Sequence, residues 1–219
     1  MFSYANLKNY STNLGVGSSN LSGRAILRRT VAPSIRATAG PRAMRKYLPR
    51  SWISSKLVPG NSRIHGVGVF AAAPLARGEK LMEFGGLAIS GEDVASELYR
   101  ERSVWKVGDD MYLALLKSDP RPSLDENLNH SCDANSWLED EVTLSAKLDI
   151  PAGREITLDQ GTWNFEDDED IWDQDRCSCG SPHCRKILAR SDWKLREVRE
   201  RYEGHFHPFV RRMIEAGEE

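Results

Sequence analysis

The sequence predicts a β-rich α+β domain, and three features of the chain lead to that fold class. Apolar residues occur in short runs, glycines and prolines interrupt those runs at close intervals, and helical periodicity is confined to the C-terminal end. Many short strands with tight turns and little helix are typical of β-rich domains. At 219 residues the chain has room for one core of ordinary size, or one domain with tails.

The expected strands begin within residues 62–73 (SRIHGVGVFAAA), where Val67, Val69 and Ala71 alternate and predict a strand pair around the glycines. Three further segments hold short apolar runs bounded by turn residues, and each predicts one strand or two. They are Gly78–Gly86, Met111–Leu116, and Val142–Leu158 with its turn at Pro151–Gly153.

Three helices are expected, each from a capping residue or an apolar periodicity. Ser90 and Asp93 form a weak capping box, which predicts a helix from Gly91 to about Arg102. Ser191 can cap another helix whose apolar face holds Leu195, Val198 and Tyr202, and residues 207–217 (HPFVRRMIEAG) can form one more. We expect the last two to pack on the strands as a C-terminal lid.

Charge divides the chain into two parts, although the net charge is only −2. No Asp or Glu precedes Glu79, whereas 12 Lys and Arg do; from Glu79 onward, 32 acidic residues outnumber 18 basic ones. Residues 1–56 are rich in Ser, Asn, Gly and Arg, which predicts a disordered basic segment. Mitochondrial and plastid transit peptides share this composition with nucleic-acid-binding arms, and composition alone does not separate them. Without a transit function, the nucleus or cytoplasm is expected.

The rest of the chain argues against two classes of partner. No apolar run approaches the roughly 20 residues that a membrane-spanning helix needs. The best candidate, Val67–Ala76, contains Gly68 and Pro74, so a membrane span is excluded. Nucleic-acid binding has no support beyond the basic N-terminal segment.

The number and spacing of the four cysteines favour their role as ligands of one metal ion. Cys177, Cys179 and Cys184 form a C-x-C-x4-C cluster, and Cys132 is the only other cysteine. Structural Zn²⁺ sites take four ligands, commonly thiolates, so the cluster is one ligand short. Two disulfides or four unconnected thiols are the alternatives, and His183 could replace one cysteine. Spacing, count and the lack of an apolar signal-peptide core favour a zinc site formed by all four cysteines.

Five motifs in order resemble the SET-domain family of protein-lysine methyltransferases. They are IHGVGVFA (64–71), GEKLMEF (78–84), LNHSCDAN (128–135), GREITLDQG (153–161) and CSCGSPHCR (177–185), the last similar to the family's post-SET zinc cluster. The resemblance covers about residues 62–186. It implies a SET-domain fold of several short β-sheets with a knot-like C-terminal threading, to which the C-terminal helices are added.

The resemblance also implies S-adenosylmethionine as cofactor and a basic, lysine-containing protein segment as substrate. The residues that match the family's cofactor-binding motifs are His65, Gly66, Val67, Gly68, Asn129 and His130. Zinc held by the four cysteines would complete a narrow channel through which the lysine reaches the methyl group. Desolvation in such a channel lowers the pKa of lysine, about 10.4 when free, and supplies the amine unprotonated.

The chain departs from the family pattern at the catalytic position. The family's tyrosine aligns with Gln160, an aromatic position two residues earlier is Leu158, and the signature's proline is Ala134. A carboxamide can donate hydrogen bonds but lacks the hydroxyl and the rigidity of a phenol. Tyr112, on a strand that the family places beside the channel, is the candidate to supply a hydroxyl. The expected catalytic residues are therefore Tyr112 and Gln160.

Two functions remain open from the sequence. A protein-lysine N-methyltransferase is favoured by Asn129, His130 and the cysteines, whereas Gln160 favours a catalytically weak or inactive SET module that acts by partner binding.

The acidic run Glu166–Asp175 is either a solvated loop or a segment that attracts basic substrates. The expected parts are a basic segment (1–56), a SET domain (57–164), an acidic loop with the post-SET zinc segment (165–188) and a helical extension (189–219).

Overall fold

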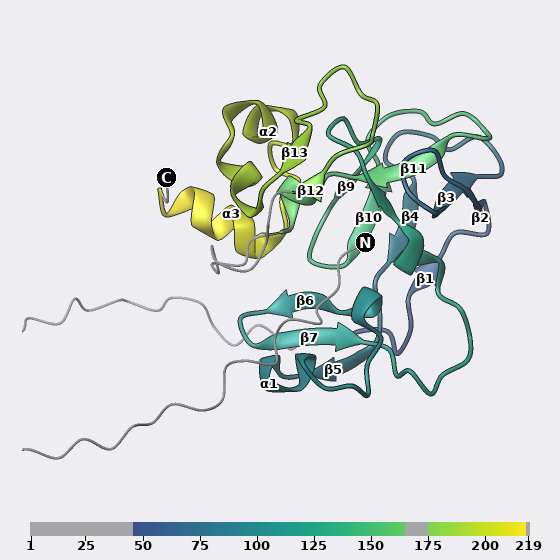
Figure 1. The fold of residues 1–219 in the computed structure, drawn as a ribbon, viewed down its shortest axis with the longest axis vertical. Coiled ribbons are helices and arrows are strands. Elements are labelled where there is room, and N and C mark those ends of the chain that lie inside the picture. The colour runs from purple at the N-terminus through teal and green to yellow at the C-terminus, as the bar shows by residue number, and fades with distance from the viewer. Residues whose placement is uncertain (1–45, 165–174, 218–219) are drawn as a thin grey trace, which may run out of the picture.

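The computed structural model describes residues 46–164 and 175–217, and Figure 1 shows their arrangement. Most of the basic N-terminal segment and nearly all of the acidic run fall outside these ranges, so the predictions made for them lie outside the described residues. Within the ranges, strands form several small sheets and the helices are short. The predicted β-rich α+β class is confirmed; the knot-like threading stays a prediction.

Two four-stranded sheets form the centre of the domain. The first has the order β1–β4–β10–β9 and consists of β1 (Trp52–Ile53), β4 (Lys80–Glu83), β10 (Thr143–Ala146) and β9 (Ser136–Leu138). The second has the order β2–β3–β11–β8 and consists of β2 (Leu57–Asn61), β3 (Val67–Ala71), β11 (Glu155–Leu158) and β8 (Asn129–His130). All neighbours pair antiparallel except β11 and β8, which are parallel.

A three-stranded sheet and the C-terminal helices flank this centre (Figure 1). The sheet has the order β5–β7–β6 and consists of β5 (Leu87–Ile89), β7 (Met111–Ala114) and β6 (Trp105–Gly108). The C-terminal part contains β12 (Asp175–Arg176), β13 (Ile187–Leu188), the 3-10 helix η5 (Arg190–Lys194), α2 (Arg196–Arg201) and α3 (Pro208–Glu215). The connections hold α1 (Gly91–Val94) and the 3-10 helices η2 (Glu101–Ser103), η3 (Leu124–Asn127) and η4 (Gln160–Thr162).

Two apolar cores hold these parts together. The larger draws residues from all three main sheets, including the fully buried Leu81 and Leu113. The smaller packs α2 and α3 together, with Val198 fully buried. Tyr202 connects the smaller core to the signature segment, because its hydroxyl accepts a hydrogen bond from the Ala134 N–H at 2.9 Å. The C-terminal helices are therefore fixed against the segment that carries the sequence signature.

The predicted helix from Gly91 to Arg102 is wrong in length. Only α1 forms, although Ser90 and Asp93 make the expected capping box. None of its residues is buried, and Leu98, beyond it, is 64% exposed. A short helix without an apolar face to bury is unstable in water, so the helix ends after one turn.

The predicted helix cap at Ser191 is also wrong. Residues 190–194 form η5, and α2 begins only after its N-cap, Leu195. The Asp192 carboxylate accepts a hydrogen bond from Arg185 Nε at 2.8 Å, which fixes this stretch in the tighter conformation. Leu195 is consequently 37% exposed, whereas the other two residues of the expected apolar face are buried. The helix predicted in residues 207–217 is confirmed by α3.

The predicted strands form where they were expected, but they do not pair as expected. Residues 62–73 contain one strand, β3, and its partner β2 ends before residue 62. The two strands predicted in Val142–Leu158 form, but they join different sheets. The turn at Pro151–Gly153 therefore connects the two central sheets instead of closing a hairpin.

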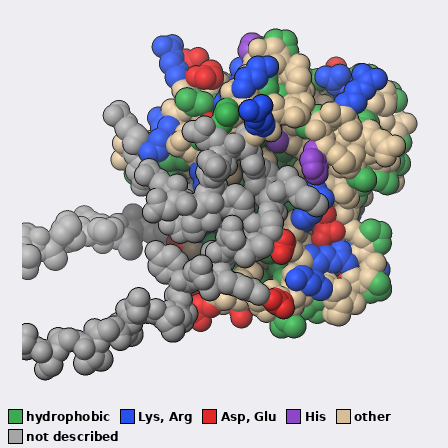
Figure 2. Space-filling view, in the orientation of Figure 1, with side chains coloured by type: hydrophobic (Ala, Val, Ile, Leu, Met, Phe, Trp, Pro, Cys, Tyr) green, Lys and Arg blue, Asp and Glu red, His purple; other side chains and the backbone are tan. Residues whose placement is uncertain are grey.

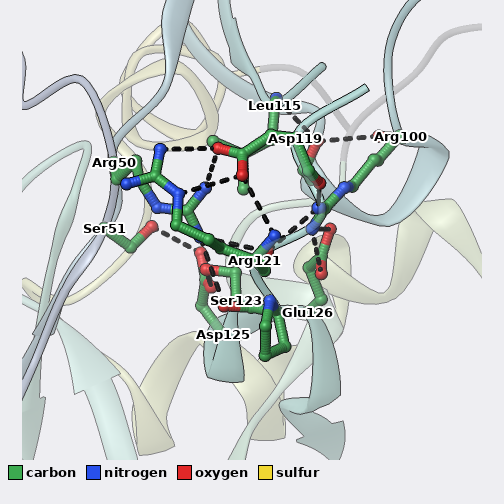
Figure 3. A network of polar contacts seen from close by, with 11 residues as sticks. Arg50, Ser51, Arg100, Leu115, Asp119, Arg121, Ser123, Asp125 and Glu126 are labelled. Carbon is green, nitrogen blue, oxygen red and sulfur yellow. Dashed lines mark hydrogen bonds and ion pairs between the residues drawn. The ribbon is translucent and has the colours of Figure 1, made fainter. Parts of the chain in front are cut away.

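The fold begins before residue 57, the expected start of the domain. Strand β1 pairs with β4, and the Gly86 N–H donates to the Leu48 carbonyl at 2.9 Å. Figure 3 shows Arg50 paired with Asp119 and Ser51 directed at Asp125. Tyr47 and Ile53 of this segment also pack against the larger core. Two apolar residues six positions apart do not form a recognisable periodicity, and the other contacts are polar, so the sequence pattern did not reveal this part of the fold.

Deleting residues 1–56 is expected to lower the melting temperature, since it removes β1 and the contacts of Arg50 and Ser51. For a domain of this size each kcal/mol lost lowers the melting temperature by about 2–4 °C. A chain lacking only residues 1–45 is the control, because it keeps every described contact. Equal melting temperatures for the two truncated chains would contradict this account of the N-terminal boundary.

Charges of both signs occur on the face of the described residues that Figure 2 presents. Figure 2 shows Lys and Arg side chains interspersed with Asp and Glu over the described part of the face in view. Among the described helices, none reaches the length and apolarity that a membrane crossing requires.

Candidate functional site

Four cysteine sulfurs converge at one place, as the sequence predicts. The Sγ atoms of Cys132, Cys177, Cys179 and Cys184 lie within 4.8 Å of one another, and all four are free thiols. The chain turns between the last two through Gly180, whose φ of 68° favours glycine. Four sulfur donors at this spacing fit a tetrahedral zinc ion.

The electrostatics of the cluster also suit a cation. Burial raises the pKa of Cys132 to about 11 and raises that of Cys177 as well. Burial acts in the same direction on Cys179, but backbone hydrogen bonds involving residues 132 and 181 lower its pKa to about 7. The Arg185 backbone N–H donates to Cys132 Sγ at 3.3 Å, a contact that favours a thiolate. A divalent cation would stabilise thiolates that burial otherwise disfavours.

The expected cofactor residues Asn129 and His130 form strand β8, parallel to β11. Both side chains are buried. Asn135 fixes the segment against β11, because its carboxamide accepts from the Thr157 N–H at 2.9 Å and donates to the Glu155 carbonyl at 2.7 Å. The signature segment is thus held in place by its own side chains.

Asn129 joins the signature segment to the glycine motif. Its Nδ2 lies 3.0 Å from the His65 carbonyl, 3.3 Å from the Val67 carbonyl and 2.8 Å from Glu155 Oε1, so its two hydrogens are shared among three acceptors. A Cβ at Gly68 would lie 2.3 Å from Glu155 Oε1, so a larger residue there would displace the carboxylate that bonds Asn129. The structure therefore brings these expected cofactor residues together.

His130 connects β8 to both the cysteine cluster and Gln160. Its Nδ1 accepts a hydrogen bond from the Gln160 backbone N–H at 3.1 Å, so Nε2 carries the proton and points at Cys132 Sγ, 3.2 Å away. Burial lowers the pKa of His130 to about 4, although Asp159 acts in the opposite direction. The imidazole is therefore neutral near pH 7.

Arg185, one residue after the last cysteine, ties the cluster to the end of β11. It donates to the two carboxylate oxygens of Asp159 at 2.8 and 2.6 Å and to Asp192 at 2.8 Å. Asp159 is fully buried and accepts from the Gly161 N–H at 2.9 Å, which caps η4. Burial raises the pKa of Asp192 despite the opposing charge of Arg185. Buried charges of this kind are tolerated only in pairs.

The two expected catalytic residues lie on different elements, and their catalytic role stays a prediction. Gln160 begins η4, whereas Tyr112 lies opposite Lys106 in the β6–β7 pair. Trp105 lies opposite Leu113 in the same pair, and consecutive pairs of a sheet point to opposite faces. Tyr112 therefore faces away from Trp105, whose ring packs beside η4. The prediction placed Tyr112 by its strand, and a strand alone does not determine the face.

Three aromatic rings pack beside η4. Trp105 stacks on Phe84 with ring centroids 4.2 Å apart and lies 5.0 Å from Trp163, the residue after η4. Trp163 Nε1 is buried and has no hydrogen-bond partner among the described residues. Because leaving a donor unsatisfied costs about 1–3 kcal/mol, this N–H is one that a bound polar group could satisfy.

Several residues of the site were not predicted from the sequence. Glu155 and Asp159 belong to the GREITLDQG motif, and Arg185 ends the cysteine motif. Their positions within these motifs could have identified them as residues of the site. His207, described below, is remote from every motif and carried no such signal. Its partners depend on the packing of the C-terminal helix.

Comparison with known proteins gives a consistent result. Residues 66–161 match the family model described as SET domain. Histone H3-lysine(4) N-trimethyltransferase ATX1 of Arabidopsis thaliana is 27% identical over 154 residues, 64% of this chain. Histone-lysine N-methyltransferase TRX1 of Oryza sativa subsp. japonica is 30% identical over 148 residues, 61% of this chain. The matched segment spans only 14% of each of these relatives.

Among solved structures, KRYPTONITE in complex with mCHG DNA and SAH is similar over 59% of this chain and 28% of that chain. Its sequence identity is 22% and its TM-score 0.45. An active polycomb repressive complex 2 in the basal state is similar over 48% of this chain and 15% of that chain, with 22% identity and a TM-score of 0.39.

Proposed function

We propose that this chain, whose residues 66–161 match the SET-domain family model and which is similar to histone-lysine methyltransferases, transfers a methyl group from S-adenosylmethionine to a lysine of a basic protein segment. One observation carries the proposal: Asn129 is hydrogen-bonded to the glycine motif, and the adjacent His130 contacts the cysteine cluster through Cys132. A structural zinc ion at the four cysteines completes the proposed site.

The residues present fit the cofactor. His65, Gly66 and Val67 are exposed next to the buried Asn129 amide. Gly66 has a φ of 50°, and no heavy atom lies within 4 Å of the position that its Cβ would take. Accessible backbone beside a buried amide offers the donors and acceptors that a small polar ligand requires. We assign His65, Gly66, Val67, Gly68, Asn129 and His130 to hold the cofactor.

When bound, S-adenosylmethionine supplies a methyl group that is already electrophilic on its sulfonium. The chain then has to align the lysine amine and keep it unprotonated. The rings of Phe84, Trp105 and Trp163 exclude water beside η4, and desolvation lowers the pKa of a lysine from about 10.4. The Gln160 carboxamide oxygen can accept a hydrogen bond from the amine and so orient its lone pair.

The relatives support the substrate class. The similar proteins of Arabidopsis and rice carry names of histone-lysine methyltransferases, and histone tails are basic, lysine-containing segments. We therefore propose a basic protein segment as the substrate.

A partner-binding module is the second candidate function, and Gln160 is the observation that favours it. The carboxamide at this position has no phenol hydroxyl, and Tyr112 lies on the face of its sheet opposite to Trp105, which packs beside η4. A module of this kind would retain the cofactor residues without turnover.

Gln160→Tyr is expected to raise the methyl-transfer rate, on the order of tenfold, because it supplies a rigid hydroxyl near the amine. The affinity for S-adenosylmethionine should stay unchanged, since Asn129 and His130 keep their contacts. Transfer of labelled methyl groups to a basic protein and calorimetric titration of the cofactor measure the two effects.

Gln160→Phe is the matched control, because it adds the ring without the hydroxyl. It should be no faster than the wild type. An equal gain from both variants would show that ring packing, and not the hydroxyl, limits the rate. No turnover by the wild type or by Gln160→Tyr, with cofactor binding retained, would favour the partner-binding module.

A further inference from the structure

His207, at the start of α3, contacts two separate parts of the domain. Its backbone N–H donates to the Thr162 carbonyl of η4 at 2.8 Å. Its imidazole Nε2 lies 3.0 Å from the Lys106 carbonyl of β6. The residue is 2% exposed, so both contacts are shielded from water. A single residue of the C-terminal extension thus joins η4 to β6.

The protonation state of this imidazole is set by its neighbours. Nδ1 accepts a hydrogen bond from the Phe209 N–H at 3.3 Å, which caps α3. Nε2 must therefore carry the proton that it donates to Lys106. Burial favours the same neutral form and lowers the pKa of His207 to about 4. The ring is fixed in one orientation by a donor on one side and an acceptor on the other.

The contact with η4 leads directly to the proposed site. Gln160 begins η4, and its carbonyl accepts from the N–H of Asn164 at 2.8 Å within the same turn. The Gln160 N–H bonds His130, whose other nitrogen faces Cys132. A hydrogen-bonded path therefore runs from the cysteine cluster through η4 to His207 and ends on β6.

Aromatic ring contacts also connect β6, η4 and His207. Trp105 of β6 lies edge-on to the His207 ring, with centroids 6.2 Å apart, and contacts Trp163 at the other end of η4. If the hydrogen bond between His207 and Lys106 is lost, β6 and η4 can separate. The ring contacts between Trp105, Trp163 and His207 would then be lost as well. The side chain of Gln160 would then lose its fixed place.

We propose that His207 is a positioning residue for methyl transfer: it fixes η4 against β6 and thereby fixes Gln160. The C-terminal extension lies outside the matched SET-domain residues 66–161, and under this proposal it is part of the active site. The catalytic consequence rests on the proposed function, whereas the coupling of His207 to η4 does not.

Two substitutions in the full chain separate the contacts of His207. His207→Asn keeps an acceptor for the Phe209 N–H, as expected of a good N-cap, but is too short to reach the Lys106 carbonyl. His207→Gln has an amide N–H that can reach it. We expect His207→Asn to lower kcat about ten- to hundredfold with little change in KM for S-adenosylmethionine, and His207→Gln to restore most of the loss.

Val210→Ala is the control, because Val210 is fully buried in the C-terminal core and makes none of these hydrogen bonds. It should lower the melting temperature without the selective loss of kcat. Equal kcat for His207→Asn and the wild type, or a loss in Val210→Ala as large as that in His207→Asn, would overturn the proposal.

Amide hydrogen exchange tests the coupling without turnover. In His207→Asn, the amides of residues 160–164 should exchange at least about tenfold faster, while those of β10 and β11 stay protected. Unchanged exchange in residues 160–164 overturns the proposal even if activity falls. If the wild type transfers no methyl groups, the proposed function fails alone, and the exchange result still decides whether His207 fixes η4.

Discussion

Cys132→Ser should release the zinc that the purified protein is expected to hold at about one ion per chain. Residue 132 lies 45 positions before Cys177, yet their sulfurs are 3.7 Å apart. A serine hydroxyl is a poor replacement for a thiolate, and binding free energies of structural zinc reach about 10–16 kcal/mol in small domains. The segment around residues 177–188 should therefore lose its fixed place, and the melting temperature should fall steeply. Elemental analysis and thermal unfolding measure both effects.

Ser131→Ala is a suitable control, since Ser131 is the buried neighbour of Cys132 and has no thiol. It should retain zinc. A Cys132→Ser protein that keeps its full zinc content would exclude the four-cysteine site, as would a wild type that contains none.

Arg185→Met is expected to lower the free energy of unfolding by about 3–5 kcal/mol, because it leaves two buried carboxylates without their partner. Asp159 is fully buried and Asp192 is 5% exposed, so neither can be solvated in place. The backbone N–H of residue 185, which donates to Cys132, is retained in the variant. Zinc content should therefore stay unchanged while stability in urea falls.

Arg196→Met provides the comparison. Arg196 pairs with Glu200 on the surface, and its side chain is 88% exposed. Exposed ion pairs four residues apart on a helix contribute only about 0.3–0.5 kcal/mol. Equal losses in the two variants would contradict the assignment of Arg185 as a buried structural link.

The fold class and most strands could be predicted from the sequence because short apolar runs between turn residues report strands directly. Pairing could not, since β10 and β11 are consecutive in sequence yet join different sheets. The predicted length of the helix at Gly91–Arg102 was wrong for a related reason. The capping box marks where a helix begins, but how far it continues depends on burial against the rest of the domain.

For the site, the sequence identified groups with characteristic chemistry and missed those defined by contact. The cysteine cluster was predicted because thiols at a characteristic spacing are visible in the sequence itself. The Asn129-His130 pair was chosen from a signature motif, and its role in cofactor binding stays a prediction. Tyr112 was assigned to the site from its strand, and the register of β6 and β7 places it on the other face. The role of Arg185 depends on its contacts, because its guanidinium lies between two buried aspartates that are 26 and 7 residues away from it in sequence.

Transfer of methyl groups from S-adenosylmethionine to lysine is the activity proposed for this chain. The most direct measurement incubates the zinc-loaded full chain with labelled cofactor and a basic, lysine-rich protein such as a histone, and locates the label by mass spectrometry. The proposed function predicts methyl-lysine in the acceptor protein and the loss of this product in the Asn129→Ala variant. Calorimetry that detects no binding of S-adenosylmethionine to the wild type, together with an unlabelled acceptor, would contradict it.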